Sequence, residues 1–174
     1  MQVSLVMTLL GPDRTGLVES VARAVAAHGG NWLESRLCRL GGEFAGILRV
    51  ELPAEKKTAL LDALQKIPGL NVAIRADETK ISAAKGGRTK LEIVGHDRPG
   101  IVREISAALA RAGVNVEEFS SEVVSAPMSG ETLFKAGARL QLPERCDLAA
   151  LKTDLEKIAA DLLVDVLFAE LCES

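Results

Sequence analysis

The chain has 174 residues, 48% of them hydrophobic, and a formal net charge of −3. This length allows one ordinary domain or two small ones, and the apolar fraction is sufficient for a buried core. The acidic balance argues against direct nucleic-acid binding, because affinity for phosphate groups needs a basic surface. The three cysteines are scattered without metal-ligand spacing, and the N-terminal apolar stretch is too short to span a membrane. We therefore expect a soluble, cytoplasmic protein that contacts no membrane.

The chain is predicted to begin with a strand that leads into a helix. Apolar residues alternate over 3–9, which is typical of a strand with one apolar face. The hexapeptide GPDRTG at 11–16 follows. The apolar residues after it recur with the spacing of one helix face, which predicts a helix at about 14–28. The Gly-Gly pair at 29–30 is expected to end this helix.

A hairpin and a second helix follow. The Gly-Gly pair at 41–42 is typical of a tight turn between two strands, and Pro53 opens a helix that the Pro-Gly pair at 68–69 ends. The predicted elements are strands at 31–40, 43–52 and 71–76 and a helix at about 54–66. Their order, β-α-β-β-α-β, is that of a ferredoxin-like unit, which has a four-stranded antiparallel sheet with both helices on one face.

The same pattern returns 84 positions later, where GHDRPG at 95–100 repeats GPDRTG. The apolar stripe of the helix returns with it, since Leu17, Val21, Ala24 and Val25 align with Ile101, Ile105, Ala108 and Leu109. The second copy is predicted to contain strands at 89–95, 114–124, 131–142 and 162–170 and helices at 98–112 and 147–160. It has about six extra residues within 121–132, whose Ala-Pro and Ser-Gly pairs suggest a longer hairpin loop.

The repeat predicts an α+β protein with two tandem ferredoxin-like domains, at 1–77 and 89–174, joined by a linker at 78–88. The linker is polar, glycine-rich and mildly basic, and we interpret it as a solvated connection rather than a nucleic-acid contact. A unit of about 80 residues is marginally stable alone, and small sheets leave exposed edge strands. We therefore expect the copies to pair, within one chain or between two, and we expect a homodimer.

The two hexapeptides match only half of a phosphate-binding loop. The Leu-Val and Ile-Val pairs directly after them occupy the positions where such a loop needs Lys followed by Ser or Thr, which argues against an NTPase. His28 and His96 occupy positions that the two copies do not share, and Cys38 is interpreted as a small packed residue. The sequence therefore predicts no catalytic residue, no metal site and no enzyme activity.

The remaining possibility is a binding loop at the start of each first helix. Asp13 and Asp97 are predicted N-caps, and the free N–H groups of a helix start attract anions such as a ligand carboxylate. The glycines that flank them allow a sharp exit from the strand and a close approach of a ligand. Asn31 and Asn115 begin the next strand, which should run near the loop, and an amide can both donate and accept hydrogen bonds. The alternative is that these residues only cap the helix and shape a turn.

The segments GPDRTGLVESVARAVAAHGGNWLES and GHDRPGIVREISAALARAGVNVEEF resemble ACT domains, and the resemblance covers nearly the whole chain as two copies. ACT domains are regulatory modules that bind small effectors, often amino acids, between paired domains. The resemblance implies that the loop, the helix start and the following asparagine line such a site. The implied ligand-binding residues are Gly11, Asp13, Gly16, Asn31, Gly95, Asp97, Gly100 and Asn115. Trp32 flanks Asn31 whereas Val116 flanks Asn115, so the two sites need not be equivalent.

A chain of two ACT-like units is similar to the glycine cleavage system transcriptional repressor family. The same motif also precedes catalytic domains, as in formyltetrahydrofolate deformylase and phosphoserine phosphatase, but only LCES follows the second unit here. The resemblance implies a non-enzymatic regulator that binds a small amino acid such as glycine, uses no cofactor and controls a transcriptional regulator by protein contact. Two alternatives remain: a stand-alone regulatory subunit of an amino-acid or one-carbon enzyme, and an interaction scaffold that binds no ligand.

Overall fold

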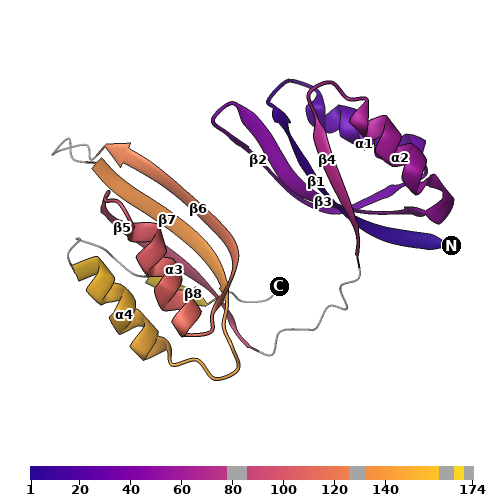
Figure 1. The fold of residues 1–174 in the computed structure, drawn as a ribbon. Helices are drawn as coiled ribbons and strands as arrows, with labels where there is room; N and C mark the ends of the chain where they lie inside the picture. Colours follow the sequence, from indigo (N-terminus) through magenta and orange to yellow (C-terminus); the bar gives the residue numbers. More distant parts are fainter. Residues whose placement is uncertain (78–85, 126–131, 161–166, 171–174) are drawn as a thin grey trace. The chain divides into compact units, whose positions relative to one another are not determined.

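The computed structural model of the chain describes residues 1–77, 86–125, 132–160 and 167–170. The chain divides into two compact units, Met1–Ile81 and Ser82–Ser174 (Figure 1). Each unit has a four-stranded antiparallel sheet with two helices side by side on one face. The α+β, ferredoxin-like fold class is therefore confirmed for both copies.

The first unit follows the predicted order of elements. They are β1 (Gln2–Pro12), α1 (Leu17–Ala27), β2 (Asn31–Leu40), β3 (Glu43–Pro53), the short 3₁₀ helix η1 (Ala54–Lys56), α2 (Lys57–Gln65) and β4 (Asn71–Ala76). The strand order in the sheet is β2-β3-β1-β4, so β2 and β4 form the two edges. The hairpin prediction is also confirmed, since Gly41 and Gly42 have φ values of 61° and 87°, which a tight turn between twisted strands requires.

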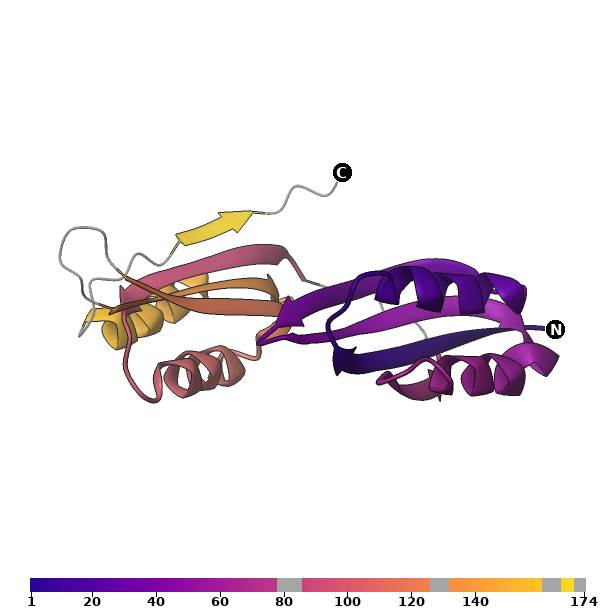
Figure 2. The ribbon, with the colours of Figure 1, turned by 90° about the horizontal axis from the view of Figure 1, so that it is seen from above.

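The second unit repeats this architecture. Its elements are β5 (Arg88–His96), α3 (Ile101–Arg111), β6 (Asn115–Ser125), β7 (Thr132–Gln141), α4 (Leu148–Ala160) and β8 (Leu167–Glu170). The strand order is β6-β7-β5-β8, and α3 lies below the strands in Figure 2. The predicted long hairpin loop falls largely on 126–131, and the first part of the predicted last strand falls on 162–166; both segments lie outside the described residues.

The core of each unit lies between its sheet and its helices. On β1 the alternate residues Leu5, Met7 and Leu9 are at most 2% exposed and pack against the helices in one cluster. The predicted apolar stripe of α1 enters this cluster, and that of α3 enters the equivalent cluster of the second unit. Each buried leucine contributes roughly 1.5–3 kcal/mol, so these stripes fix which way each helix faces.

Both first helices end on a glycine in the left-handed conformation. Gly29 after α1 has φ 69°, and Gly113 after α3 has φ 68°. The Gly29 N–H donates to the Ala26 carbonyl at 3.0 Å, and the Gly30 N–H donates to the Val25 carbonyl at 2.9 Å. This pair of bonds is the Schellman motif, which satisfies the last carbonyls and turns the chain into β2. The predicted helix stop is confirmed.

Among the described residues of each unit, no element covers the face of the sheet away from the helices, and these two open faces differ. The first carries exposed Leu10 and Ile47. The second carries Glu92, Glu122 and Lys135 around a hollow of about 540 Å³. The units therefore repeat in fold but not in surface chemistry. Among the described helices, none is long and apolar enough to cross a membrane.

Candidate ligand-binding loops

The loop between β1 and α1 is built around Gly16. This residue is the N-cap of α1 with φ 82°, and Gly100 is the N-cap of α3 with φ 90°. Neither helix start has a side-chain cap. The prediction that Asp13 and Asp97 cap these helices is therefore wrong, and α1 and α3 begin three residues later than predicted. The left-handed backbone at the glycine turns the chain into the helix, a geometry that only glycine adopts freely.

Asp13 instead ties the loop to the neighbouring hairpin. Its carboxylate lies 2.7 Å from Nε of Arg39 on β2, and its backbone N–H donates to the Gly42 carbonyl at 2.9 Å. In the second unit the Asp97 N–H donates to the Thr132 carbonyl at 3.0 Å. Each loop is thus held against the turn end of its sheet by one backbone hydrogen bond.

Gly11 has a structural role at the same end of the first sheet. A Cβ atom at this position would lie 2.5 Å from the Gly69 carbonyl oxygen and 3.3 Å from Cα of Leu70. Both neighbours are backbone atoms of the chain that enters β4, and they cannot move aside easily. Glycine is required here because the two chain segments pass so closely. The predicted reason was a different one, a sharp exit of the chain from the strand.

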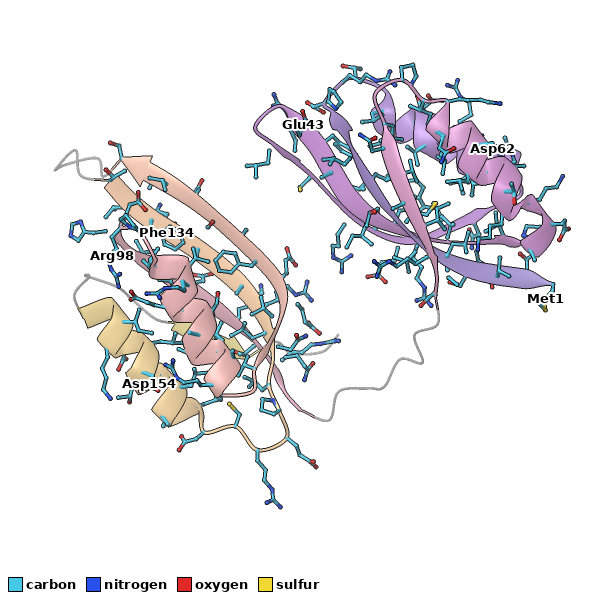
Figure 3. All side chains as sticks on the ribbon, in the orientation of Figure 1. Met1, Glu43, Asp62, Arg98, Phe134 and Asp154 are labelled. Atoms are coloured by element: carbon cyan, nitrogen blue, oxygen red, sulfur yellow. The ribbon has the colours of Figure 1, made fainter. Side chains whose placement is uncertain are left out.

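In the second loop, Arg98 is held by its own unit. Its guanidinium donates two hydrogen bonds to the Glu104 carboxylate, at 3.0 and 2.5 Å, beside the first turn of α3 (Figure 3). These hydrogen bonds, together with the positive charges of Arg98 and Arg103, lower the pKa of Glu104 from its ordinary value of 4.5. Paired, parallel bonds of this kind hold the guanidinium in a fixed plane. The Glu104 carboxylate therefore neutralises the charge of Arg98 within the second unit.

The first loop has no equivalent clamp. The residue that aligns with Glu104 is Ser20, whose hydroxyl donates to the Gly16 carbonyl at 2.9 Å. Arg14 is exposed, and no ion pair in the described part of the chain involves it. Arg14 was not among the predicted ligand-binding residues, although the difference between Ser20 and Glu104 is visible when the two copies are aligned. The two loops therefore differ in their arginine: the Arg14 guanidinium is exposed, whereas the Arg98 guanidinium is bound by Glu104.

Asn31 does not lie near the loop of its own unit. It pairs with Glu51, which pairs with Ser4 of β1, and Gly11 lies seven residues further along that strand. At about 3.3 Å per residue this is a separation of about 23 Å. The predicted proximity is therefore wrong, because α1 runs back along the sheet and delivers the next residue to its opposite end. A single unit does not assemble the proposed set of Gly11, Asp13, Gly16 and Asn31.

The second unit repeats this arrangement. Asn115 pairs with Gln141, which pairs with Arg88, and Gly95 again lies seven residues further along β5. Trp32 differs from its counterpart Val116 by packing partly against the core, with its indole N–H 3.4 Å from the Ser35 hydroxyl. The loop half and the asparagine half of each predicted site therefore lie at opposite ends of each sheet.

The first unit also has one histidine and one cysteine, His28 and Cys38. His28 is at the end of α1, where its Nδ1 lies 2.7 Å from the Ala24 carbonyl oxygen, which is a structural contact. Cys38 is exposed on β2, so the prediction of a small packed residue is wrong for it. Its side chain faces the open side of the sheet because Leu37, its neighbour, faces the core. Within the described ranges no group of His, Cys, Asp and Glu is arranged to hold a metal ion.

The solved structures that match nearly the whole chain include the following two. An unknown protein from Galdieria sulphuraria is 31% identical with a TM-score of 0.88, over 99% of this chain and 100% of that one. A protein provisionally described as a glycine cleavage system transcriptional repressor is 18% identical with a TM-score of 0.69, over 98% and 99%. At 18% identity, the match to this second protein shows a shared fold and no more. A search of curated protein sequences gives no significant match.

The family comparison agrees with the geometry. The model of the ACT domain matches residues 4–71 and 91–169, which lie in the first and the second unit respectively. Together these two segments make up more than half of the chain. The chain therefore belongs to the ACT domain family, as a tandem pair of ACT domains.

Proposed function

We propose that this protein is a non-enzymatic regulator that senses a small amino acid and controls a partner protein by direct contact. The observation that carries the proposal is the pair of ACT domains, each with an open helix start, that make up most of the chain. The matching fold of the protein described as a glycine cleavage system transcriptional repressor supports a transcriptional regulator of amino-acid or one-carbon metabolism as the partner.

The effector site belongs to the first loop. The Leu17 N–H donates to the Arg14 carbonyl at 3.3 Å, and a ligand carboxylate fits against the N–H groups that follow it at the helix start, where the dipole favours an anion. The exposed Arg14 guanidinium adds charge-assisted hydrogen bonds at the same end of the helix. In the second loop the corresponding guanidinium is occupied by Glu104. The two sites are therefore unequal, and the first has the higher affinity.

The second half of the site comes from another ACT unit. An asparagine amide can accept a hydrogen bond from a ligand ammonium group and donate one to its carboxylate. Because Asn31 lies about 23 Å from the loop of its own unit, the amide at this site belongs to a unit paired with it edge to edge. The ligand then binds at the junction and stabilises one arrangement of the pair, which a partner protein recognises. The shift in population is limited by the difference in ligand affinity between the two arrangements.

The size of the ligand limits the affinity. Glycine has five heavy atoms, and a ceiling of roughly 1.5 kcal/mol per heavy atom gives at most about 7.5 kcal/mol. This corresponds to a dissociation constant of several micromolar at best. Such binding is weak and reversible, as sensing of an abundant metabolite requires.

The thermal denaturation temperature of the full chain, measured against a panel of amino acids, tests the effector claim. A ligand at 100 times its dissociation constant stabilises the folded state by about 2.7 kcal/mol, which raises the melting temperature by several degrees. We expect glycine or serine to do so and Asn115→Ala to reduce the shift. Equal melting temperatures across the panel would leave only an interaction scaffold.

Affinity capture with the full chain, with and without the effector, identifies the partner. A transcriptional regulator whose capture depends on the effector is the expected result. Capture of a metabolic enzyme in its place would assign the protein as a regulatory subunit.

A further inference from the structure

The open face of the first sheet carries an apolar patch at the end where β2 turns into β3. Leu10 and Ile47 are 50% and 52% exposed on this face, and Leu40 at the end of β2 is 80% exposed. The strand registers place the apolar residues side by side, since Leu10 pairs with Ala45 and Ala45 pairs with Cys38. We call these five residues, Leu10, Cys38, Leu40, Ala45 and Ile47, the turn-end patch.

The second sheet is less apolar at the same positions. The registers of the two sheets correspond, so that Leu10, Cys38, Ala45 and Ile47 align with Val94, Glu122, Lys135 and Gly137. Because both units have the same fold, the fold itself does not require an apolar patch here. An exposed apolar patch with a polar rim is typical of an interaction site. The turn-end patch therefore belongs to a contact that the second unit does not make.

The size of the patch indicates what covers it. It spans three strands and about five residues along each, which is roughly 14 Å by 16 Å. A stable dimer buries about 800 Å² on each partner, well above this area of about 220 Å². A single helix fits, since it is about 10 Å wide and about ten of its residues span 15 Å. Sheet faces bury apolar residues against helices, as the opposite face of this sheet does against α1 and α2. The patch thus suits one helical segment of a partner rather than a second copy of the chain.

Two arginines border the patch on the side away from the turn, Arg36 of β2 and Arg75 of β4. Arg75 is exposed and makes no ion pair in the described part of the chain, and Arg36 makes an exposed contact of 3.3 Å with Glu34. Exposed contacts of this kind are weak, so both guanidinium groups can pair with a partner. Glu43 lies at the opposite, turn end beside Leu40. The charge that complements the arginine border is that of carboxylates along one flank of the bound helix.

We propose that the turn-end patch binds an amphipathic helical segment of a partner protein. The apolar face of the segment covers Leu10 and Ile47, and carboxylates along its flank contact Arg36 and Arg75. The assignment of this segment to the regulator that the protein controls rests on the proposed function. The surface itself stands on the exposed patch and its arginine border.

The patch adjoins the loop between β1 and α1, where the effector is proposed to bind. This loop follows Leu10 closely in sequence, and the Asp13 N–H donates to the Gly42 carbonyl at 2.9 Å. The Asp13 carboxylate also lies 2.7 Å from Nε of Arg39, which is next to Leu40 in the chain. A ligand that repositions the loop therefore displaces the hairpin end that carries Leu40. Effector binding then changes the affinity of the patch for the partner.

A synthetic peptide tests the surface in the full chain. The probe has about 15 residues of leucine, alanine and glutamate, with leucines on one face of the helix and glutamates along its flank. Fluorescence anisotropy measures its binding with no amino acid present. We expect saturable binding that Leu10→Glu/Ile47→Glu weakens by roughly tenfold or more, because two apolar side chains lose their contact. Arg36→Glu/Arg75→Glu should weaken it as well, and should favour a peptide with lysine in place of glutamate.

The matched control is Val94→Glu/Gly137→Glu, which adds the same charges at the aligned positions of the second sheet and should bind the peptide like the wild type. A Cβ at position 137 would meet only the Ser120 hydroxyl at 3.6 Å, so the control is expected to fold. Cys38 lies in the patch and gives an independent readout. Bound peptide should slow the alkylation of Cys38 and leave that of Cys146 unchanged.

Three results would overturn the surface: no saturable peptide binding, unchanged Cys38 reactivity, or equal affinity for Leu10→Glu/Ile47→Glu and the control when circular dichroism shows both folded. A lower molar mass of Leu10→Glu/Ile47→Glu than of the wild type in light scattering would assign the patch to a second copy of the chain instead. Peptide binding without any amino acid binding would refute the proposed function and leave the surface standing. Amino acid binding without peptide binding would refute the surface alone.

Discussion

The difference between the two loops gives the sharpest prediction about binding. Ser20→Glu places a carboxylate on α1 at the position where Glu104 holds Arg98 on α3. The new side chain is expected to clamp Arg14 in the same way, since the two loops share the D-R-x-G backbone and the left-handed glycine before the helix. The first loop then loses its available guanidinium.

The magnitude follows from the interaction that is lost. A hydrogen bond to a charged group contributes about 1.5–3 kcal/mol, which corresponds to roughly a 10- to 150-fold weaker affinity for the effector. Equilibrium dialysis with radiolabelled glycine measures this change directly. Ser20→Gln is the matched control, because it has the same size as the glutamate but carries no charge and cannot neutralise Arg14.

Glu104→Gln is the reciprocal change. It replaces the carboxylate that binds Arg98 by a neutral amide and so weakens this contact. We expect the variant to have a second, weaker binding site for the effector in each chain. If Ser20→Glu binds glycine as tightly as Ser20→Gln, Arg14 is not a ligand contact and the assignment of the effector to the first loop is wrong.

Three further outcomes follow from the described contacts. Gly16→Ala should lower the free energy of unfolding by about 1–2 kcal/mol in urea denaturation, because its φ of 82° is left-handed. Gly137→Ala should have a smaller effect, since its Cβ would meet only the Ser120 hydroxyl at 3.6 Å. Cys38 should be alkylated faster than Cys146 at pH 7.5, since burial and the Asp147 charge raise the pKa of the Cys146 thiol; equal rates would contradict this. Because the pKa of Glu104 is lowered in the folded state, the Arg98 clamp should be complete above pH 4.5 and be lost as the pH falls through that depressed pKa. A carboxyl titration by NMR should give Glu104 a midpoint below its ordinary value of 4.5.

The fold could be predicted from the sequence because the apolar stripe of the first helix and the glycine that ends this helix recur in both copies. The apolar stripe of α1 and the Gly-Gly turns at 29–30 and 41–42 are local signals, and the structure places them as predicted. The helix starts were predicted wrongly because Asp13 is a good capping residue by type. The backbone conformation that makes Gly16 the cap depends on how the loop crosses the end of the sheet.

The site was harder to predict because it depends on distances that the sequence order hides. Asn31 follows Gly11 closely in sequence but lies at the other end of the sheet, as the direction of α1 dictates. The clamp between Arg98 and Glu104 joins residues six positions apart, and its absence from the first copy is visible only as Ser20 in the aligned position. A comparison of the two copies residue by residue would have revealed this difference without a structure.

The central claim, that the first ACT unit binds a small amino acid, is tested most directly by isothermal titration of glycine and serine into the full chain and into Arg14→Met. We expect saturable heat with a dissociation constant of several micromolar or weaker. We also expect Arg14→Met to weaken this binding while leaving the melting temperature of the ligand-free chain unchanged. Flat titrations of the folded wild-type chain with both amino acids would contradict it.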